Sequence, residues 1–329
     1  MKTTTLATIK KITQRKHNLS LLTMLPFVLF WMSCTKGTSE QATAENTVVF
    51  QEPAGTSSVK IVTVGGTITE TVCALGLCDN IVATDLTSSY PEHMRQLPSL
   101  GYRNSIKAEG IISTGAELVL VEAGYLDKVV EEQLAAANIK TYLFENKWSK
   151  AGSAELITAL GKLLQQEGKA TELVQELEQD FAEVNTLLQR AKTKPKVLFV
   201  YARGQGTLNI GGRKTFADAM LQLAGAQLAV PEIEDYKPLT AEAMIAANPD
   251  YLLFFDTGLQ SLGGAGGVAA IPGIKETAAG KKNQVISMDG LYLSGFGPRL
   301  GKAVKELAWQ LHPELHTPDN LHQNALTHN

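Results

Sequence analysis

The sequence contains few of the side chains that hold metals or carry covalent catalysis. Its 329 residues include three cysteines and six histidines, and no two cysteines form a Cys-x-x-Cys pair. The histidines are scattered over positions 17, 93, 312, 316, 322 and 328. A structural zinc site needs four such ligands at short, paired spacings, so the sequence argues against one.

Signatures of enzymes and of nucleic-acid-binding proteins are also missing. The sequence has no Gly-x-Ser-x-Gly, His-Glu-x-x-His or catalytic Cys–His arrangement. Its glycine-rich stretches, "GQGTLNIGG" and "LGGAGG", lack the spacing of phosphate-binding loops. The formal net charge is −3, and no basic patch predicts nucleic acid as a partner. An exported α/β enzyme stays an alternative, but it would need a nucleophile and a base that no motif provides.

The N-terminus has the order of a secretory signal. Four lysines and arginines between positions 10 and 16 precede an apolar run at 21–32, and Ser33 and Cys34 follow it. The run is shorter than the ~20 residues that span a bilayer, which disfavours the alternative of a transmembrane anchor. The junction "WMSC" resembles a bacterial lipobox, although Trp31 replaces the usual small aliphatic residue. That resemblance implies cleavage before Cys34 and lipid on its sulfur, so we predict a lipoprotein signal over 1–34 and a flexible tether over 35–58.

Short apolar runs, most of them separated by helical segments, make up the body of the chain. Each is rich in Val, Ile, Leu and Phe and ends in turn residues: "VKIVTVGG", "NIVATD", "AELVLVEAG", "IKTYLFE", "KPKVLFVYARG", "PDYLLFFDTG" and "NQVISMD". Fully apolar strands that alternate with helices are typical of parallel sheets covered on both faces. We therefore predict an α/β fold.

The middle of the chain differs from this pattern. Residues 169–192 carry an apolar stripe at helical spacing, and Pro195 follows the stripe. The sequence predicts two Rossmann-like lobes, at 59–168 and 193–313, joined by one long α-helix, with a ligand cleft between them and a tail at 314–329. Because the predicted helix contains no glycine, we expect only limited closure of the lobes.

The two lobes resemble each other in sequence. "AEGIISTGAELVLV", from Ala108, aligns without a gap with "AEAMIAANPDYLLF", from Ala241, and places Glu109 opposite Glu242. "GGTITETVCALG", from Gly65, parallels "GGRKTFADAMLQLAG", from Gly211, each with a Gly-Gly pair after a strand and before a helix. Two matches in the same order indicate a duplicated fold.

Loops that follow the predicted strands are rich in tyrosine and arginine. Ligands of such sheets bind beyond the carboxyl ends of the strands. The residues in these loops are Tyr90, Tyr102, Tyr125, Tyr201, Tyr292, Phe296, Arg103, Arg203 and Arg299. Arginine holds carboxylates in a bidentate fork, and tyrosine can stack or bind ferric iron as phenolate. The cleft therefore suits a flat ligand with acidic groups, whereas the alternative is that these tyrosines only fill space.

Three longer stretches carry a family resemblance. "VTVGGTITETVCALGLCDNIVATDLTSSYPEHMRQLPSLGYRNSIKAEGIIS", "YKPLTAEAMIAANPDYLLFF" and "LYLSGFGPRLGKAVKELAWQLHP" resemble the periplasmic haemin-binding proteins of ABC importers. The resemblance covers roughly residues 59 to 313, with its motifs in the family's order. The wider family also binds ferric siderophores and cobalamin, and these ligands stay as alternatives.

The resemblance implies specific roles. Tyr102 matches the tyrosine that ligates haem iron, and Arg299 matches an arginine that holds the phenolate or a propionate. Members often carry Lys or Arg two residues after the tyrosine, where this chain has Asn104. Further ligand contacts are expected from Arg103, Tyr125 and Arg203.

Partners follow from the same resemblance. It implies that Glu109 and Glu242 dock on the membrane permease of an importer driven by its ATPase, whereas alone they read as ordinary acids in a first helical turn. Some relatives use a second-lobe histidine for another haem. Here that lobe has no histidine before His312, so we expect one haem and no catalytic cofactor. Cys73 and Cys78 are open to two interpretations, a disulfide in an exported chain or a buried thiol at Cys73.

Overall fold

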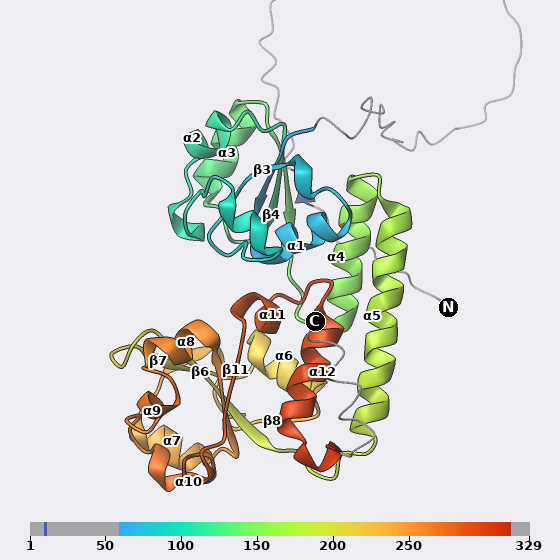
Figure 1. Cartoon of the computed structure of the whole chain (residues 1–329). Coiled ribbons are helices and arrows are strands. Elements are labelled where there is room, and N and C mark those ends of the chain that lie inside the picture. The colour runs from blue at the N-terminus through green and yellow to red at the C-terminus, as the bar shows by residue number, and fades with distance from the viewer. Residues whose placement is uncertain (1–9, 12–58, 317–329) are drawn as a thin grey trace, which may run out of the picture.

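The computed structural model describes residues 10–11 and 59–316 and has two α/β lobes beside a pair of long helices (Figure 1). Its fold class is the predicted one. The first lobe runs through β2 (Ile61–Val64), α1 (Gly66–Ala74), β3 (Ile81–Thr84), α2 (Ala108–Ser113), β4 (Leu118–Glu122), α3 (Lys128–Ala136) and β5 (Lys140–Phe144). Its sheet has the order β1-β5-β4-β2-β3, in which β1 (Lys10–Lys11) is antiparallel to β5 and the other pairs are parallel.

The second lobe repeats the parallel part of this sheet. It contains β6 (Lys196–Ala202), β7 (Leu208–Gly211), α6 (Phe216–Leu223), β8 (Gln227–Leu228), β9 (Tyr236–Pro238), α7 (Ala241–Ala247), β10 (Tyr251–Phe255), α8 (Asp256–Ser261), α9 (Ala265–Val268), α10 (Ala278–Lys282), β11 (Val285–Met288), α11 (Gly290–Ser294) and α12 (Leu300–Leu311). The parallel order β8-β6-β10-β11 corresponds to β3-β2-β4-β5 of the first lobe.

An antiparallel extension distinguishes the second lobe from the first. After β6 the chain turns at Gly204, whose φ is 67°, and returns as β7, which pairs with β6 and with β9. The sequence pattern predicts only parallel layers and misses this hairpin. As a result Gly211 closes the antiparallel β7, whereas Gly65 follows the parallel β2, so the second of the two sequence matches holds only in part.

The helix–strand unit that the sequence aligns without a gap recurs as a structural repeat. Helix α2 begins at Ala108 and α7 at Ala241, and β4 begins at Leu118 and β10 at Tyr251, so the same spacing separates both pairs. Each helix is followed by a residue of positive φ, Gly115 at 68° and Asn248 at 37°. The duplication predicted from the sequence is confirmed for this unit.

Two antiparallel helices, α4 (Lys150–Leu163) and α5 (Glu167–Leu188), lie side by side along one flank, and α12 packs against α5 (Figure 1). The long helix begins two residues before the predicted 169–192 and ends four residues before its predicted end. Leu188 is the last apolar side chain of its stripe, and the polar residues beyond it have no core to anchor another turn. Among the described residues, no helix combines the length and apolar composition that crossing a membrane requires.

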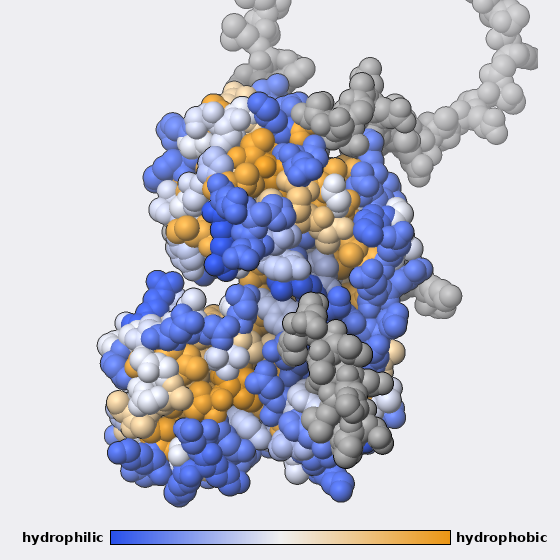
Figure 2. Space-filling view, viewed as in Figure 1, coloured by the Kyte–Doolittle hydropathy of each residue, from blue (hydrophilic) through white to orange (hydrophobic). Residues whose placement is uncertain are grey.

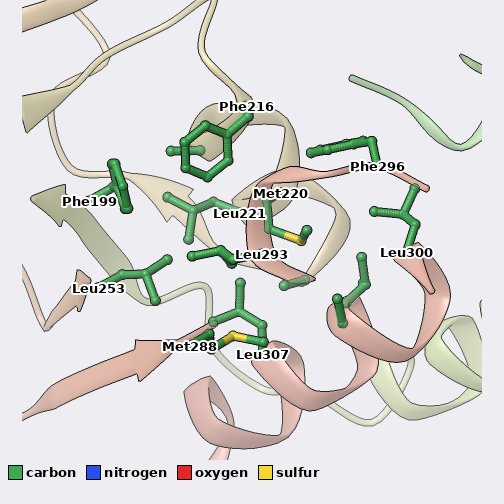
Figure 3. Close-up of a cluster of buried hydrophobic side chains, with 14 of the residues drawn as sticks. Phe199, Phe216, Met220, Leu221, Leu253, Met288, Leu293, Phe296, Leu300 and Leu307 are labelled. Carbon is green, nitrogen blue, oxygen red and sulfur yellow. The ribbon is translucent and has the colours of Figure 1, made fainter. Parts of the chain in front are cut away.

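One buried apolar cluster connects the lobes. It includes Ile68 and Val72 of α1, Leu160 of α4, Leu177 of α5 and the side chains around Phe296 that Figure 3 shows. A smaller cluster, with Val62 and Val119, lies on the other face of the first sheet, because successive strand residues point to opposite faces. The core of the second lobe is therefore continuous with one side of the first.

Polar contacts reinforce this junction. The loop from Gly295 to Arg299, the "GFGPR" segment, lies against α1 and the start of α4. The carbonyl of Gly295 accepts hydrogen bonds from Thr67 Oγ1 at 2.7 Å and Asn146 Nδ2 at 3.0 Å. The carbonyl of Phe296 accepts one from Ser153 Oγ at 2.7 Å. Phe296 has a φ of 54°, an uncommon conformation for a bulky residue that these contacts hold in place.

Cys73, near the end of α1, is disulfide-bonded to Cys78. Of the two interpretations that the sequence leaves open, the disulfide is the one that the structure contains. A disulfide agrees with a chain that folds outside the reducing cytosol.

Candidate functional site

Tyr102 lies in the loop between β3 and α2, with 38% of its surface exposed. Gly101, at a φ of 89°, sets the turn before it, and the carbonyl of Gly101 accepts a hydrogen bond from the backbone of Leu86 at 3.0 Å. The carbonyl of Tyr102 accepts two more, from the amide and the hydroxyl of Ser105, both at 2.7 Å. The backbone of Tyr102 is thus fixed while its ring stays accessible.

Two guanidinium groups, one from each lobe, flank the ring of Tyr102. Arg103 Nη2 donates a hydrogen bond to the Tyr102 hydroxyl at 3.2 Å, and its Cζ lies 4.9 Å from the ring centre of Tyr125. From the second lobe, the Cζ of Arg203 lies 6.0 Å from the ring centre of Tyr102 and 5.5 Å from that of Tyr201. Figure 2 shows a hollow between the lobes on the side away from α5. Tyr102, Arg103, Tyr125 and Arg203 are therefore brought together across the two lobes, as a common ligand site would require.

Arg103 and Arg203 lack ion-pair partners within the part of the chain that the structure describes. Across residues 59–316, the structure contains no ion pair to Arg103 or to Arg203. Burial alone would lower the pKa of Arg103, but the oxygens of Tyr125 and Tyr102 and the carboxylate of Glu122 outweigh it and raise that pKa. Arg103 stays cationic and can hold an anion on the ligand.

The second lobe adds Tyr201 and Tyr236 to the aromatic surface. The ring of Tyr201 packs edge-on against Phe255, 6.2 Å between centres, and Phe255 stacks on Phe216 inside the lobe. Burial raises the pKa of Tyr236 to about 12, with Tyr201 adding to the rise and Arg103 opposing it. Tyr236 thus stays protonated at neutral pH. Tyr236 is 43% exposed in β9, which pairs with β7, the strand that also pairs with β6 at Tyr201.

Glu122 lies beneath this cluster, at the carboxyl end of β4. Burial raises the pKa of its carboxyl to about 7, and the nearby Asp85 adds to the rise. The amide of Asn146, 3.4 Å from Glu122 Oε1, and the guanidinium of Arg103 oppose it. Gly65 allows this approach, because a Cβ there would lie 2.8 Å from the Cβ of Glu122.

Glu122 is expected to make stability fall as the pH rises. Since its pKa is higher in the folded chain than the usual value near 4.5, its contribution is complete below pH ~4.5 and is lost as the pH passes 7. The raised pKa corresponds to about 3 kcal/mol in the free energy of unfolding. Denaturant titrations at pH 5 and pH 8 should show Glu122→Gln losing this dependence, whereas Glu132→Gln, at an exposed position of α3, should keep it. If the free energy of unfolding changed equally between pH 5 and pH 8 in the wild type and in both variants, the pH dependence would not come from Glu122.

Arg299 lies at the junction of the lobes and bonds to a carboxylate rather than to Tyr102. Its Nε and Nη2 donate to the two carboxylate oxygens of Glu70 at 2.9 and 2.8 Å, and its backbone amide donates to the same group at 3.3 Å. Its Cζ lies 3.5 Å from the ring centre of Tyr90 and 4.9 Å from that of Tyr292. In this structure Glu70 occupies both donors of the Arg299 fork. That Arg299 holds the phenolate or a propionate stays a prediction.

The other predicted residues occupy several environments. Glu109 in α2 and Glu242 in α7 are exposed, whereas Cys34 lies outside the described residues. His93 is exposed in a short 3₁₀ helix, η2 (Glu92–Gln96). His312 is fully buried, with Nε2 at 3.2 Å from the carbonyl of Ala224, so its role is structural.

Sequence reasoning missed Glu122, Asn146 and Tyr236 at the site and Glu70 at the junction. Glu122 carried a usable signal, since it is an acid directly after an apolar strand. Tyr236 and Glu70 carried none, because only the folded chain brings them to their partners.

A family model described as "Periplasmic binding protein" matches residues 61–291. The chain belongs to this family. Its members are binding proteins rather than enzymes, so the chain is a periplasmic binding protein of the ABC importer type.

Relatives within the family differ in the ligand that their names state. The structure of the "Periplasmic heme-binding protein RhuT from Roseiflexus sp. RS-1 in apo form" is 34% identical, with a TM-score of 0.76 over 79% of this chain and 100% of that one. "Periplasmic heme-binding protein BhuT in complex with two hemes" is 33% identical, with a TM-score of 0.74 over the same shares.

Two further relatives have names that do not mention haem. An "Uncharacterized ABC transporter substrate-binding lipoprotein YvrC" of Bacillus subtilis (strain 168) is 26% identical over 84% of this chain and 86% of that protein. A "Vitamin B12-binding protein" of Photorhabdus laumondii is 24% identical over 77% and 88%. The family is thus established, whereas its members' names do not agree on one ligand.

Proposed function

We propose that this protein captures ferric haem outside the cytoplasm and delivers it to the permease of an ABC importer. The observation that carries the proposal is the partly exposed Tyr102, whose hydroxyl is bonded to Arg103 and whose ring is faced by Arg203 from the opposite lobe. The haem-binding structures similar to this chain give independent support.

The chemistry of the site suits haem. A tyrosine oxygen bound to iron carries negative charge, and Fe(III) accepts such a hard ligand better than Fe(II) does. The Arg103 guanidinium, 3.2 Å from this oxygen, offsets part of that charge. Arg203 is free of internal ion pairs within the described residues and is available to a propionate, while Tyr125, Tyr201 and Tyr236 offer ring surface to the porphyrin.

Cobalamin is the second candidate, because a vitamin B12-binding protein is among the relatives of this chain. The periphery of cobalamin carries neutral amides in place of two propionates. Cobalamin has a single anionic group, the phosphodiester of its nucleotide loop, so it can pair with only one of the two guanidiniums, whereas the two propionates of haem can pair with both. A ferric siderophore is a third candidate, and no observation in the site favours it over haem.

A titration with haemin followed by visible absorption tests the proposal. We expect a Soret band that saturates at one equivalent, together with a charge-transfer band typical of tyrosinate-bound ferric iron. Cyanocobalamin, titrated in parallel, should produce no saturable change. Saturation at two equivalents would correct the stoichiometry. Binding of cobalamin without binding of haemin would overturn the proposal.

Delivery requires that the protein stay near the membrane and recognise the permease. We infer lipidation at Cys34, which agrees with the lipoprotein name of one relative, and docking through Glu109 and Glu242. Mass spectrometry of the membrane fraction should find a mature chain that begins with acylated Cys34. An unmodified Cys34, or a chain that still begins at Met1, would rule out the anchor.

A further inference from the structure

Two large apolar side chains are exposed at equivalent positions of the structural repeat. Ile112 in α2 is 41% exposed and Ile245 in α7 is 47% exposed. The alignment that places Glu109 opposite Glu242 also places Ile112 opposite Ile245. A single exposed isoleucine is ordinary on a protein surface. Here an exposed isoleucine occurs at the same position of both repeats, three residues after a glutamate each time, and this recurrence needs an explanation.

Each isoleucine shares a helix face with its glutamate. Residues three apart in a helix are neighbours on the surface, so Glu109 and Ile112 form one patch, and Glu242 and Ile245 form another. The buried anchors beneath them, Ile111 and Met244, are both 0% exposed. Each helix thus buries one large apolar residue, together with an alanine, and presents the next apolar residue to solvent.

The two patches are exposed to solvent, and the charge of each glutamate is not balanced by an ion pair among the described residues. Small exposed residues stand near each isoleucine in the sequence, Gly110 and Ser113 by Ile112 and Ala246 by Ile245. In the part of the chain that the structure describes, neither Glu109 nor Glu242 forms an ion pair. Helices α2 and α7 both lie on the side of the molecule away from α5, one in each lobe (Figure 1).

We propose that the two Glu–Ile patches are matched two-point contacts for the permease, in which each glutamate pairs with a cation and each isoleucine enters an apolar recess beside that cation. This inference rests on the proposed delivery to an importer and adds Ile112 and Ile245 to the docking glutamates. Because the two patches are copies of each other, the partner must offer the same site twice, as a permease built from two equivalent subunits does. The isoleucines supply apolar contact, whereas the glutamates supply orientation and encounter rate.

The test uses the mature chain and the purified ABC importer of its native host, embedded in nanodiscs. Binding is measured for Ile112→Ser, Ile245→Ser and the double variant, with Val129→Ser as the matched control. Val129 is 63% exposed on α3 of the first lobe, and no acid stands three residues before it. We expect about a tenfold loss for each isoleucine and about a hundredfold loss for both, with Val129→Ser unchanged.

Rescue and ligand binding separate this inference from the proposed function. Ile→Val at both positions should restore most of the importer binding, and haemin titrations should be the same in all variants. If haemin does not bind the wild type, the proposed ligand fails, whereas importer binding still tests the patches. Importer binding by the double variant within twofold of the wild type would overturn the inference. So would an equal loss in Val129→Ser, or a wild-type dimer in size-exclusion chromatography that the double variant converts to monomer.

Discussion

Tyr102→Phe is expected to abolish the tyrosinate charge-transfer band of the haem complex and to weaken ferric haem binding by about 100-fold or more. Loss of a group next to a metal ligand costs 10–100-fold in affinity, so loss of the ligand itself should reach at least the upper end. The substitution keeps the ring between Arg103 and Arg203 and removes only the oxygen that accepts the bond from Arg103. Visible titrations with haemin provide the measurement.

Matched variants make this test specific. Tyr125→Phe removes a hydroxyl from the same cluster, and burial raises the pKa of that group, which disfavours it as an anionic ligand. Its charge-transfer band should therefore be unchanged. Arg103→Met should leave the band in place but weaken binding, because the iron-bound oxygen loses its charged donor. An unaltered spectrum in Tyr102→Phe would show that another residue, among His93, Tyr90 and Tyr125, binds the iron.

Glu70→Ala is expected to produce the largest loss of stability, about 3–5 kcal/mol in the free energy of unfolding. The Glu70 side chain is only 5% exposed, and its two oxygens receive both donors of the Arg299 fork. Removal of one partner leaves the other charge largely out of water without compensation. Denaturant titration gives the free energy. Arg299→Ala should also act mainly on stability, and affinity for haemin should change less.

A double-mutant cycle isolates the pair itself. Glu70→Met combined with Arg299→Met replaces the ions by apolar groups of similar length, so the double variant should be more stable than either single one.

Small-angle scattering of the wild type should change little on binding, because the pair and the bonds to Gly295 and Phe296 fix the lobes. Additive losses in the cycle, or a radius of gyration that falls by several ångströms with haemin, would contradict this view of the junction.

Features that depend on local burial could be predicted from the sequence. The fully apolar strands, the stripe of the long helix and the aligned helix–strand unit each follow from the spacing of apolar residues. The loops with Tyr102, Arg103, Tyr125 and Arg203 could be predicted as one site, because parallel strands place their carboxyl-terminal loops at one edge.

Features that depend on pairing between distant segments could not be predicted from the sequence. Arg299 and Glu70 are far apart in the sequence, and many other carboxylates stood as equal candidates for the partner. The hairpin of β7 depends on a turn at Gly204 and on pairing with β9, neither of which apolar spacing encodes. The bounds of α5 depend on where its last apolar residue, Leu188, finds a core to contact.

The continuous core has a consequence for how the chain reaches its native state. Helix α12 is among the last described elements along the chain, yet Leu300, Val304 and Leu307 complete the cluster that also contains Ile68 of α1. The first lobe therefore emerges with one apolar face still uncovered. Contacts between residues this distant in sequence form slowly, and the uncovered face is open to aggregation in the interval. Folding should thus finish late and as one cooperative event, only after α12 has packed against the first lobe.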